Sequence, residues 1–216
     1  MASYTLMNET TPVLDFAYDL EAHTVTKVGT VHNAAAAPLG LFDEHGQVTR
    51  KDIDYWWRHR AIPSSREQID RLLQNLDLDT TLELAERTFG LSLSDRYWIN
   101  DRDHPQRWEN INFFDNDFSD DLGILTLGQD SGSGGSPVPD YRSTNLTSPN
   151  ATVDGDLRKK WKLVGGTHVL VKAGVGFANQ EPYNEVVATG LHRRLLQPGD
   201  YTPYRLFEEN RRVYSA

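Results

Sequence analysis

The sequence predicts an α+β fold in which an N-terminal antiparallel sheet with helices precedes a second antiparallel sheet with one helix. Short runs of alternating apolar and polar residues, separated by turn residues, occur at both ends of the chain and favour strands. Apolar residues at helical spacing occur between residues 50 and 90 and again after residue 181. The 216 residues, 38% of them hydrophobic, suffice for one large domain or two small ones with a buried core.

The first elements are expected to be strands. Residues 4–7 and 12–18 flank a polar turn at residues 8–11, and residues 24–31 continue the meander. In the second run Leu14, Phe16 and Tyr18 alternate with the residues of the opposite face, so one face of this strand is largely apolar. We therefore expect a small antiparallel sheet here.

Three helices are expected to follow. The first covers residues 50–60 with Thr49 as its N-cap, and its apolar side chains are Ile53, Trp56 and Trp57. Ser64 or Ser65 is expected to cap the second, with Glu67 completing a capping box to Ser64; its apolar positions are Ile69, Leu72, Leu73 and Leu76. The third covers residues 80–89 and ends at Gly90, a residue type favoured just beyond a helix.

The middle of the chain divides it into two regions. Residues 91–128 are aromatic and irregular, which indicates buried loops and short strands. Residues 128–139 are rich in glycine, serine and proline, a composition typical of a flexible linker. We therefore predict an N-terminal region at 1–127, a linker at 128–140 and a C-terminal region at 141–216.

The C-terminal region is predicted to begin with a hairpin. Residues 160–164 and 167–172 are strand-like, and Gly165-Gly166 between them favours a tight turn. A helix is expected at residues 181–196, with Pro182 in its first turn and an apolar stripe of Val186, Val187, Leu191 and Leu195. A last hairpin is expected from residues 201–206 and 212–214.

Charge and composition exclude several classes of protein. The net charge is 22 − 31 = −9, which argues against broad binding of nucleic acid. Residues 1–156 carry 12 basic and 26 acidic side chains, whereas residues 157–216 carry 10 basic and 5 acidic ones. Cysteine is absent, which excludes disulfides and thiol nucleophiles. With no apolar run of membrane-spanning length and no secretory signal, we expect a cytoplasmic protein without membrane contact.

One constellation suggests phosphate chemistry. Lys172 ends an apolar strand, and Glu185 follows thirteen residues later on a predicted helix. In protein kinases a strand lysine holds the nucleotide phosphates, and a glutamate on the next helix orients it. Upstream, a polar turn at residues 148–157 leads into a basic strand and is able to cradle phosphates, although it matches neither the Walker loop nor the Gly-x-Gly-x-x-Gly of kinases. The alternative is that Lys172 is a surface lysine at a strand end, that Glu185 is unrelated to it, and that the basic strand is a solvated hairpin edge.

Other candidate sites are weaker. Residues 115–121 form the densest acidic cluster, but a calcium loop would need glycine where Asp120 stands and glutamate where Thr126 stands, so a capped, solvated loop is expected. The seven histidines lack the spacing of a zinc site. Trp56-Trp57 beside basic residues would suit base stacking, but we expect the tryptophans in the core and the arginines pointing outward.

Residues 148–196 resemble the N-terminal lobe of the HipA-like serine/threonine kinase family. The resemblance lies in Asp154-Gly155-Asp156-Leu157-Arg158-Lys159-Lys160-Trp161-Lys162, in Val169-Leu170-Val171-Lys172, and in Gln180-Glu181-Pro182-Tyr183-Asn184-Glu185-Val186-Val187-Ala188. Residues 55–66, 91–98 and 111–116 resemble the leading region of compact members of that family. The resemblance implies that Lys172 contacts ATP phosphates, that Glu185 pairs with it, and that Asp154, Gly155 and Lys159 belong to a phosphate-side loop.

The departure from the family limits the expected activity. A kinase needs a second lobe with a catalytic aspartate and metal-binding asparagine and aspartate residues, and only residues 197–216 follow the predicted helix. We therefore expect the N-terminal portion of a HipA-like kinase, inactive alone, with Mg²⁺ bound only if a C-lobe is supplied. The alternatives are a non-catalytic module that binds a C-lobe, an antitoxin or a toxin–antitoxin or phage-related regulator, and a DNA-associated regulator that uses the helices at 50–90.

Overall fold

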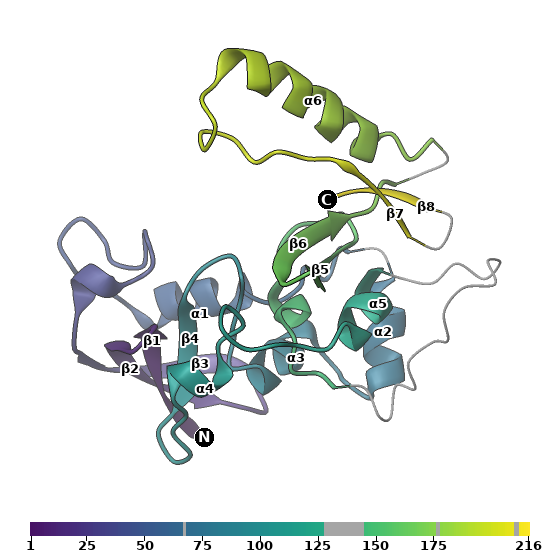
Figure 1. The fold of residues 1–216 in the computed structure, drawn as a ribbon. Helices are drawn as coiled ribbons and strands as arrows, with labels where there is room; N and C mark the ends of the chain where they lie inside the picture. Colours follow the sequence, from purple (N-terminus) through teal and green to yellow (C-terminus); the bar gives the residue numbers. More distant parts are fainter. Residues whose placement is uncertain (67, 128–144, 176–177, 210–211) are drawn as a thin grey trace.

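The computed structural model describes residues 1–66, 68–127, 145–175, 178–209 and 212–216. Within them the chain is α+β, as predicted, with two four-stranded antiparallel sheets and six α-helices (Figure 1). The elements in chain order are β1 (Ala2–Asn8), β2 (Thr11–Asp19), β3 (Thr24–Val31), the 3₁₀ turn η1 (Ala34–Ala36), α1 (Arg50–Arg58), α2 (Ile69–Leu76), α3 (Thr81–Arg87), β4 (Tyr97–Asp101), α4 (Trp108–Ile111), α5 (Asp121–Leu127), the 3₁₀ turn η2 (Pro149–Thr152), β5 (Lys159–Val164), β6 (Thr167–Lys172), α6 (Glu181–Leu195), β7 (Leu206–Glu209) and β8 (Arg212–Ser215).

The N-terminal sheet has the strand order β3-β2-β1-β4. The three predicted strands are present, and β4, which the sequence did not resolve from its aromatic surroundings, closes the sheet by pairing Ile99 with Leu6. Leu14, Phe16 and Tyr18 of β2 are buried as expected. Val13 and Asp15 on the opposite face are buried too. The strand is therefore covered on both sides rather than on one.

Helix α1 packs on this sheet through Trp57, which is buried and donates a hydrogen bond from Nε1 to the Tyr18 hydroxyl at 3.2 Å. The prediction of a core position is confirmed for Trp57, and Arg58 is half exposed as predicted, but Arg60 does not point outward. Arg60 is buried, because its guanidinium donates to the Gly90 carbonyl at 2.8 Å and to both carboxylate oxygens of Asp95 at 2.8 Å. At Gly90, where φ is +65°, a Cβ would stand 2.5 Å from the Trp57 ring, so this turn needs glycine.

The ends of α2 and α3 differ from the prediction in two places. Helix α2 begins at Ile69 after Gln68 in a left-handed conformation, so neither Ser64 nor Ser65 caps it; the predicted box from Glu67 lies outside the described residues. Helix α3 has the Thr80 cap, which accepts from the Glu83 N–H at 3.3 Å while Glu83 accepts from the Thr80 N–H at 3.0 Å. The helix ends earlier than residue 89, because Phe89 already adopts a positive φ of 55°.

Asp54 joins α1 to β3 and gives a testable pH dependence. Its carboxylate accepts hydrogen bonds from the Thr24 hydroxyl at 2.9 Å, the Val25 N–H at 2.9 Å and the Arg58 guanidinium at 2.7 Å. Burial opposes ionisation, but the bonds from Arg58, Val25 and Thr24 outweigh it and lower the pKa of Asp54. Its stabilising contribution is therefore complete above the usual carboxyl pKa of about 3.9 and is lost as pH falls through the lower folded value.

We expect the free-energy difference between the wild type and Asp54→Asn to be constant near neutral pH and to shrink below about pH 4. Urea unfolding at a series of pH values measures it. A difference that stays the same down to about pH 2 would contradict this assignment.

The second sheet has the order β5-β6-β8-β7. The hairpin of β5 and β6 with its Gly165-Gly166 turn is confirmed, and both glycines have positive φ. The last hairpin lies later than predicted, because residues 201–205 are not strand and β7 starts at Leu206. The predicted linker at 128–140 lies outside the described residues. None of the described helices combines the length and the apolar character needed to cross a membrane.

Helix α5 begins at Asp121, the last residue of the loop predicted at 115–121, and residues 115–120 are not helical, as predicted. It packs on β5 at Gly123, where a Cβ would approach the Lys160 side chain at 3.2 Å. Asp120, just before the helix, binds Lys160 Nζ at 3.2 Å, and Glu209 of β7 binds the same nitrogen at 3.0 Å. Only 1% of Lys160 is exposed. The acidic cluster therefore supplies a counter-ion to a buried lysine.

Candidate functional site

The end of β6 and the middle of α6 are joined by an ion pair. Lys172 Nζ lies 3.1 Å from Glu185 Oε1, and both side chains are largely buried. This is the pair that the resemblance predicted, and it is present. The second oxygen of Glu185 accepts a hydrogen bond from the Ser215 hydroxyl at 2.9 Å, and Ser215 lies opposite Lys172 across the β6–β8 pair. The glutamate is thus fixed at both oxygens.

A tyrosine completes the surroundings of the lysine. Lys172 Nζ donates to the Tyr204 hydroxyl at 2.5 Å and lies 4.5 Å from the centre of its ring. The backbone N–H of Tyr204 donates in turn to the buried Thr189 hydroxyl of α6 at 2.9 Å. Burial lowers the pKa of Lys172, but Tyr204 and Glu185 outweigh it and raise that pKa above its ordinary value. The ammonium is therefore held charged and in one place.

Lys159 stands beside this pair. It is the register partner of Lys172 across β5 and β6, so both side chains project from the same face of the sheet. Burial, together with the positive charges of Arg66 and Lys172, lowers the pKa of Lys159. Like charges opposite each other destabilise a sheet unless something offsets them. Lys159 and Lys172 therefore form a cationic face on this sheet, whose charge is offset in the structure by Glu185 and by the Asp154 carbonyl.

The loop that leads into β5 lies against this cationic face. Lys159 Nζ donates to the Asp154 carbonyl at 2.7 Å, and a Cβ on Gly155, whose φ is +92°, would come within 2.6 Å of that nitrogen. The Gly155 N–H donates to the Asp154 carboxylate at 2.6 Å. Asp154 therefore offers an acceptor rather than a donor, and it occupies the N–H group that a phosphate oxygen would need.

The loop is held from the N-terminal half by two side chains. Arg66 is buried, and its guanidinium donates to the Gly155 carbonyl at 2.6 and 3.0 Å and to the Val153 carbonyl. Ser65 donates to the Asp156 carboxylate at 2.6 Å. Burial lowers the pKa of Arg66 to about 10, against the attraction of Asp154 and Asp156. These contacts fix the backbone at 153–156.

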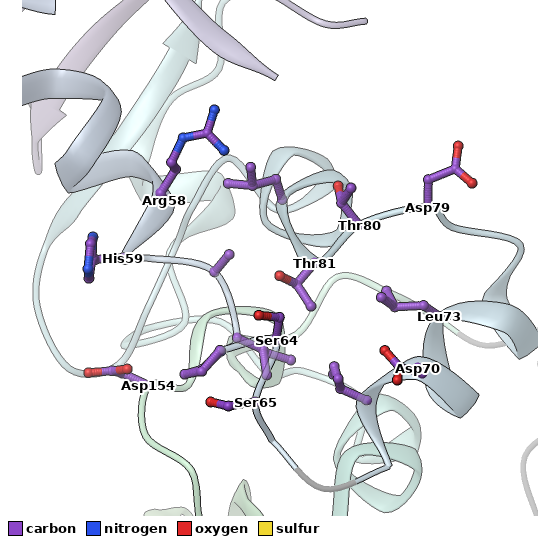
Figure 2. Close-up of a pocket in the computed structure, with 15 residues that line it drawn as sticks. Arg58, His59, Ser64, Ser65, Asp70, Leu73, Asp79, Thr80, Thr81 and Asp154 are labelled. Carbon is purple, nitrogen blue, oxygen red and sulfur yellow. The ribbon is translucent and has the colours of Figure 1, made fainter. Parts of the chain in front are cut away.

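A cavity of about 480 Å³ is lined in part by Asp154 of this loop. Figure 2 shows Ser64, Ser65 and Thr81 around it, with Asp154 at its edge beside His59. Neither Lys159 nor Lys172 lines it. Asp154 links the two places, because it lines the cavity and its carbonyl accepts a hydrogen bond from Lys159.

The donors on this face are the ammonium groups of Lys159 and Lys172, which are groups of the kind that bind phosphates. The Arg66 guanidinium donates to the Val153 and Gly155 carbonyls, and the Gly155 N–H donates to Asp154. Within the described ranges, no group of three or more histidine, aspartate or glutamate side chains is placed to hold a metal ion. The arrangement can therefore position an anion, and a metal would need ligands from the anion itself or from elsewhere.

No family model, curated protein or solved structure matches this chain. The resemblance to HipA-like kinases therefore stays a prediction from the sequence segments quoted above.

The structure brings together the predicted residues Lys172, Glu185 and Lys159, and it places Asp154 and Gly155 on the loop beside them. Sequence reasoning missed Tyr204, Ser215 and Arg66. The two hydroxyl residues follow α6 in a stretch without a motif, and Arg66 lies about ninety residues before the loop that it holds. No local pattern in the sequence predicts these contacts.

Proposed function

We propose that residues 141–216 form a polyphosphate-binding module resembling the small lobe of a HipA-like serine/threonine kinase, with ATP as its ligand. The observation that carries the proposal is the Lys172–Glu185 ion pair at 3.1 Å with Lys159 directly opposite. A strand lysine oriented by a glutamate on the following helix is the arrangement by which kinases hold nucleotide phosphates. Under this proposal Lys172 and Lys159 bind the phosphates, and Asp154 and Gly155 shape the adjoining loop.

Phosphoryl transfer would require groups beyond this binding module. A serine or threonine acceptor would need a catalytic aspartate and metal-binding groups from a second lobe, which a longer chain or a separate partner protein would supply. Mg²⁺ would then arrive with the nucleotide and be held by that lobe. The module described here would position the phosphates and neutralise their charge.

Two alternatives stay predictions. A DNA-associated role for the helices at 50–90 gains nothing from Trp57 and Arg60, which are buried. A protein-binding role is favoured by one observation, the outward apolar face of α6 described in the next subsection.

The proposal is tested by titrating the full chain into a fluorescent ATP analogue and following anisotropy. We expect Lys172→Met to weaken binding about tenfold or more, since a charge-assisted bond to phosphate contributes about 1.5–3 kcal/mol. Glu185→Gln should weaken it less, because the lysine keeps its charge and loses only its orientation. Lys27→Met, which removes an exposed lysine of β3, is the control and should bind like the wild type.

Competition identifies the part of the nucleotide that is bound. Tripolyphosphate should displace the analogue and adenosine should not. The proposal fails if neither ATP nor tripolyphosphate binds at millimolar concentration, or if Lys172→Met and Lys27→Met behave alike.

A further inference from the structure

The apolar ridge of α6 faces away from the protein. The ridge consists of side chains four residues apart, and their exposed fractions are large: Tyr183 47%, Val187 72%, Leu191 56% and Leu195 69%. The sequence predicted an apolar stripe of Val186, Val187, Leu191 and Leu195 on this helix without assigning its direction, and the last three of these side chains are exposed. Figure 1 shows α6 lying over the β7–β8 hairpin at the far end from the N-terminal sheet.

The reason lies on the inner side of the helix. Glu185 turns inward to Lys172 and Ser215, and Thr189 turns inward to the Tyr204 N–H. Pro182 and Thr189 are the buried residues of α6. Polar contacts therefore hold the helix in place, and its apolar side is left uncovered. A contiguous exposed apolar surface on a folded protein indicates an interaction site.

The charges along α6 favour an antiparallel partner with the same sequence. Glu181 lies in the first turn, and His192, Arg193 and Arg194 lie in the last. The two arginines are exposed and have no ion pair within the described part of the chain. A second α6 in the opposite direction brings unlike charges and unlike helix-dipole ends together at both ends of the contact, whereas a parallel one opposes like charges.

The ridge is also self-complementary in size. An antiparallel copy centred level with Thr189 places Tyr183 opposite Leu195 and Val187 opposite Leu191. Ridges of side chains four residues apart interdigitate when two helices cross at about −50°. Gly190 lies next to the centre, and the space where its Cβ would stand is open. Glycine inside a helix costs about 1 kcal/mol relative to alanine, and here it permits close approach of a second backbone.

We propose that this face binds a second copy of the chain through an isologous, antiparallel α6–α6 contact. One pair of crossing helices covers less area than the roughly 1,200–2,000 Å² of a stable interface, so the dimer is weak and reversible. The inference is independent of nucleotide binding, because the side chains involved point away from Lys172.

Sedimentation velocity of the full chain at loading concentrations from micromolar to near millimolar tests the dimer. The wild type should shift from monomer toward dimer as concentration rises. Leu191→Glu should stay monomeric over the same range with an unchanged melting temperature. Leu39→Glu changes a fully exposed leucine outside α6 and should dimerise like the wild type.

Cross-linking tests the direction of the pairing, since the chain has no cysteine of its own. Under mild oxidation Gly190→Cys should form a disulfide-linked dimer, because this position lies near the two-fold axis. Tyr183→Cys should not, because its symmetry mate lies at the other end of the contact. A monomeric wild type at every concentration overturns the proposal, as does efficient cross-linking through Tyr183→Cys, which would indicate a parallel pair.

Discussion

Replacing Lys160 by methionine is expected to lower the free energy of unfolding by about 3 kcal/mol, because it removes the buried counter-ion of Asp120 and Glu209 and leaves them only the partly exposed Lys162. Lys160 Nζ lies within 3.2 Å of Asp120 and within 3.0 Å of Glu209, and its own side chain is 2% exposed. Burial already raises the pKa of Asp120 despite the neighbouring lysines. Hydrogen bonds from Lys162 and Lys160 lower the pKa of Glu209 against the effect of its burial. Urea unfolding measures the loss.

Lys162 provides the matched control for this substitution. It is two residues further along β5 and contacts the same glutamate, but a quarter of its side chain is exposed. Lys162→Met should therefore cost about 1 kcal/mol or less. Adding Asp120→Asn and Glu209→Gln to Lys160→Met should restore part of the stability, since the unpaired charges are then gone. Equal losses for the two lysine variants would refute the assignment.

Arg66→Ala is expected to destabilise the chain by about 2–4 kcal/mol, since hydrogen bonds from a charged donor contribute about 1.5–3 kcal/mol. The guanidinium donates hydrogen bonds to both the Val153 and the Gly155 carbonyl, and both carbonyls lose this donor in the variant. If the loop at 153–156 also shapes the phosphate site, binding of the ATP analogue should weaken in parallel.

Arg66→Lys should fail to restore either property, because one ammonium cannot reproduce the planar fork of donors. Arg71→Ala, which changes an exposed arginine of α2, should stay within about 0.5 kcal/mol of the wild type. Thermal and urea unfolding of the three variants give the comparison. A stable Arg66→Ala variant would mean that the loop keeps its shape without this anchor.

The parts of the fold that the sequence predicted are those in which local signals decide the outcome. The alternation in β2, the N-cap of α1 at Thr49 and the Gly165-Gly166 turn each act within a few residues. The Lys172–Glu185 pair was also accessible, because a strand and the next helix bring the two residues together. These features need no knowledge of the rest of the chain.

The remaining features depend on distant partners. Lys160 reads as a solvent-exposed charge in the sequence, and it is buried because Asp120 and Glu209 come to it from elements about forty and fifty residues away. The apolar stripe of α6 was recognised, but its direction was not, because Glu185 and Thr189 find polar partners beneath the helix. The periodicity of the sequence identifies the apolar face of the helix, but the contacts made by the opposite face decide whether the apolar face points to the core or to solvent.

The anchoring of the loop at 153–156 has a consequence for the order of folding. The β5–β6 hairpin closes through a two-residue turn and is a local structure that forms within microseconds. The hydrogen bonds from Arg66 join residues up to 89 positions apart in the sequence. They form only after the entropy cost of closing this long stretch of chain has been overcome. We therefore expect the strand that presents Lys159 to form before the turn beside it, and the cationic face to reach its final shape only when the N-terminal half has folded.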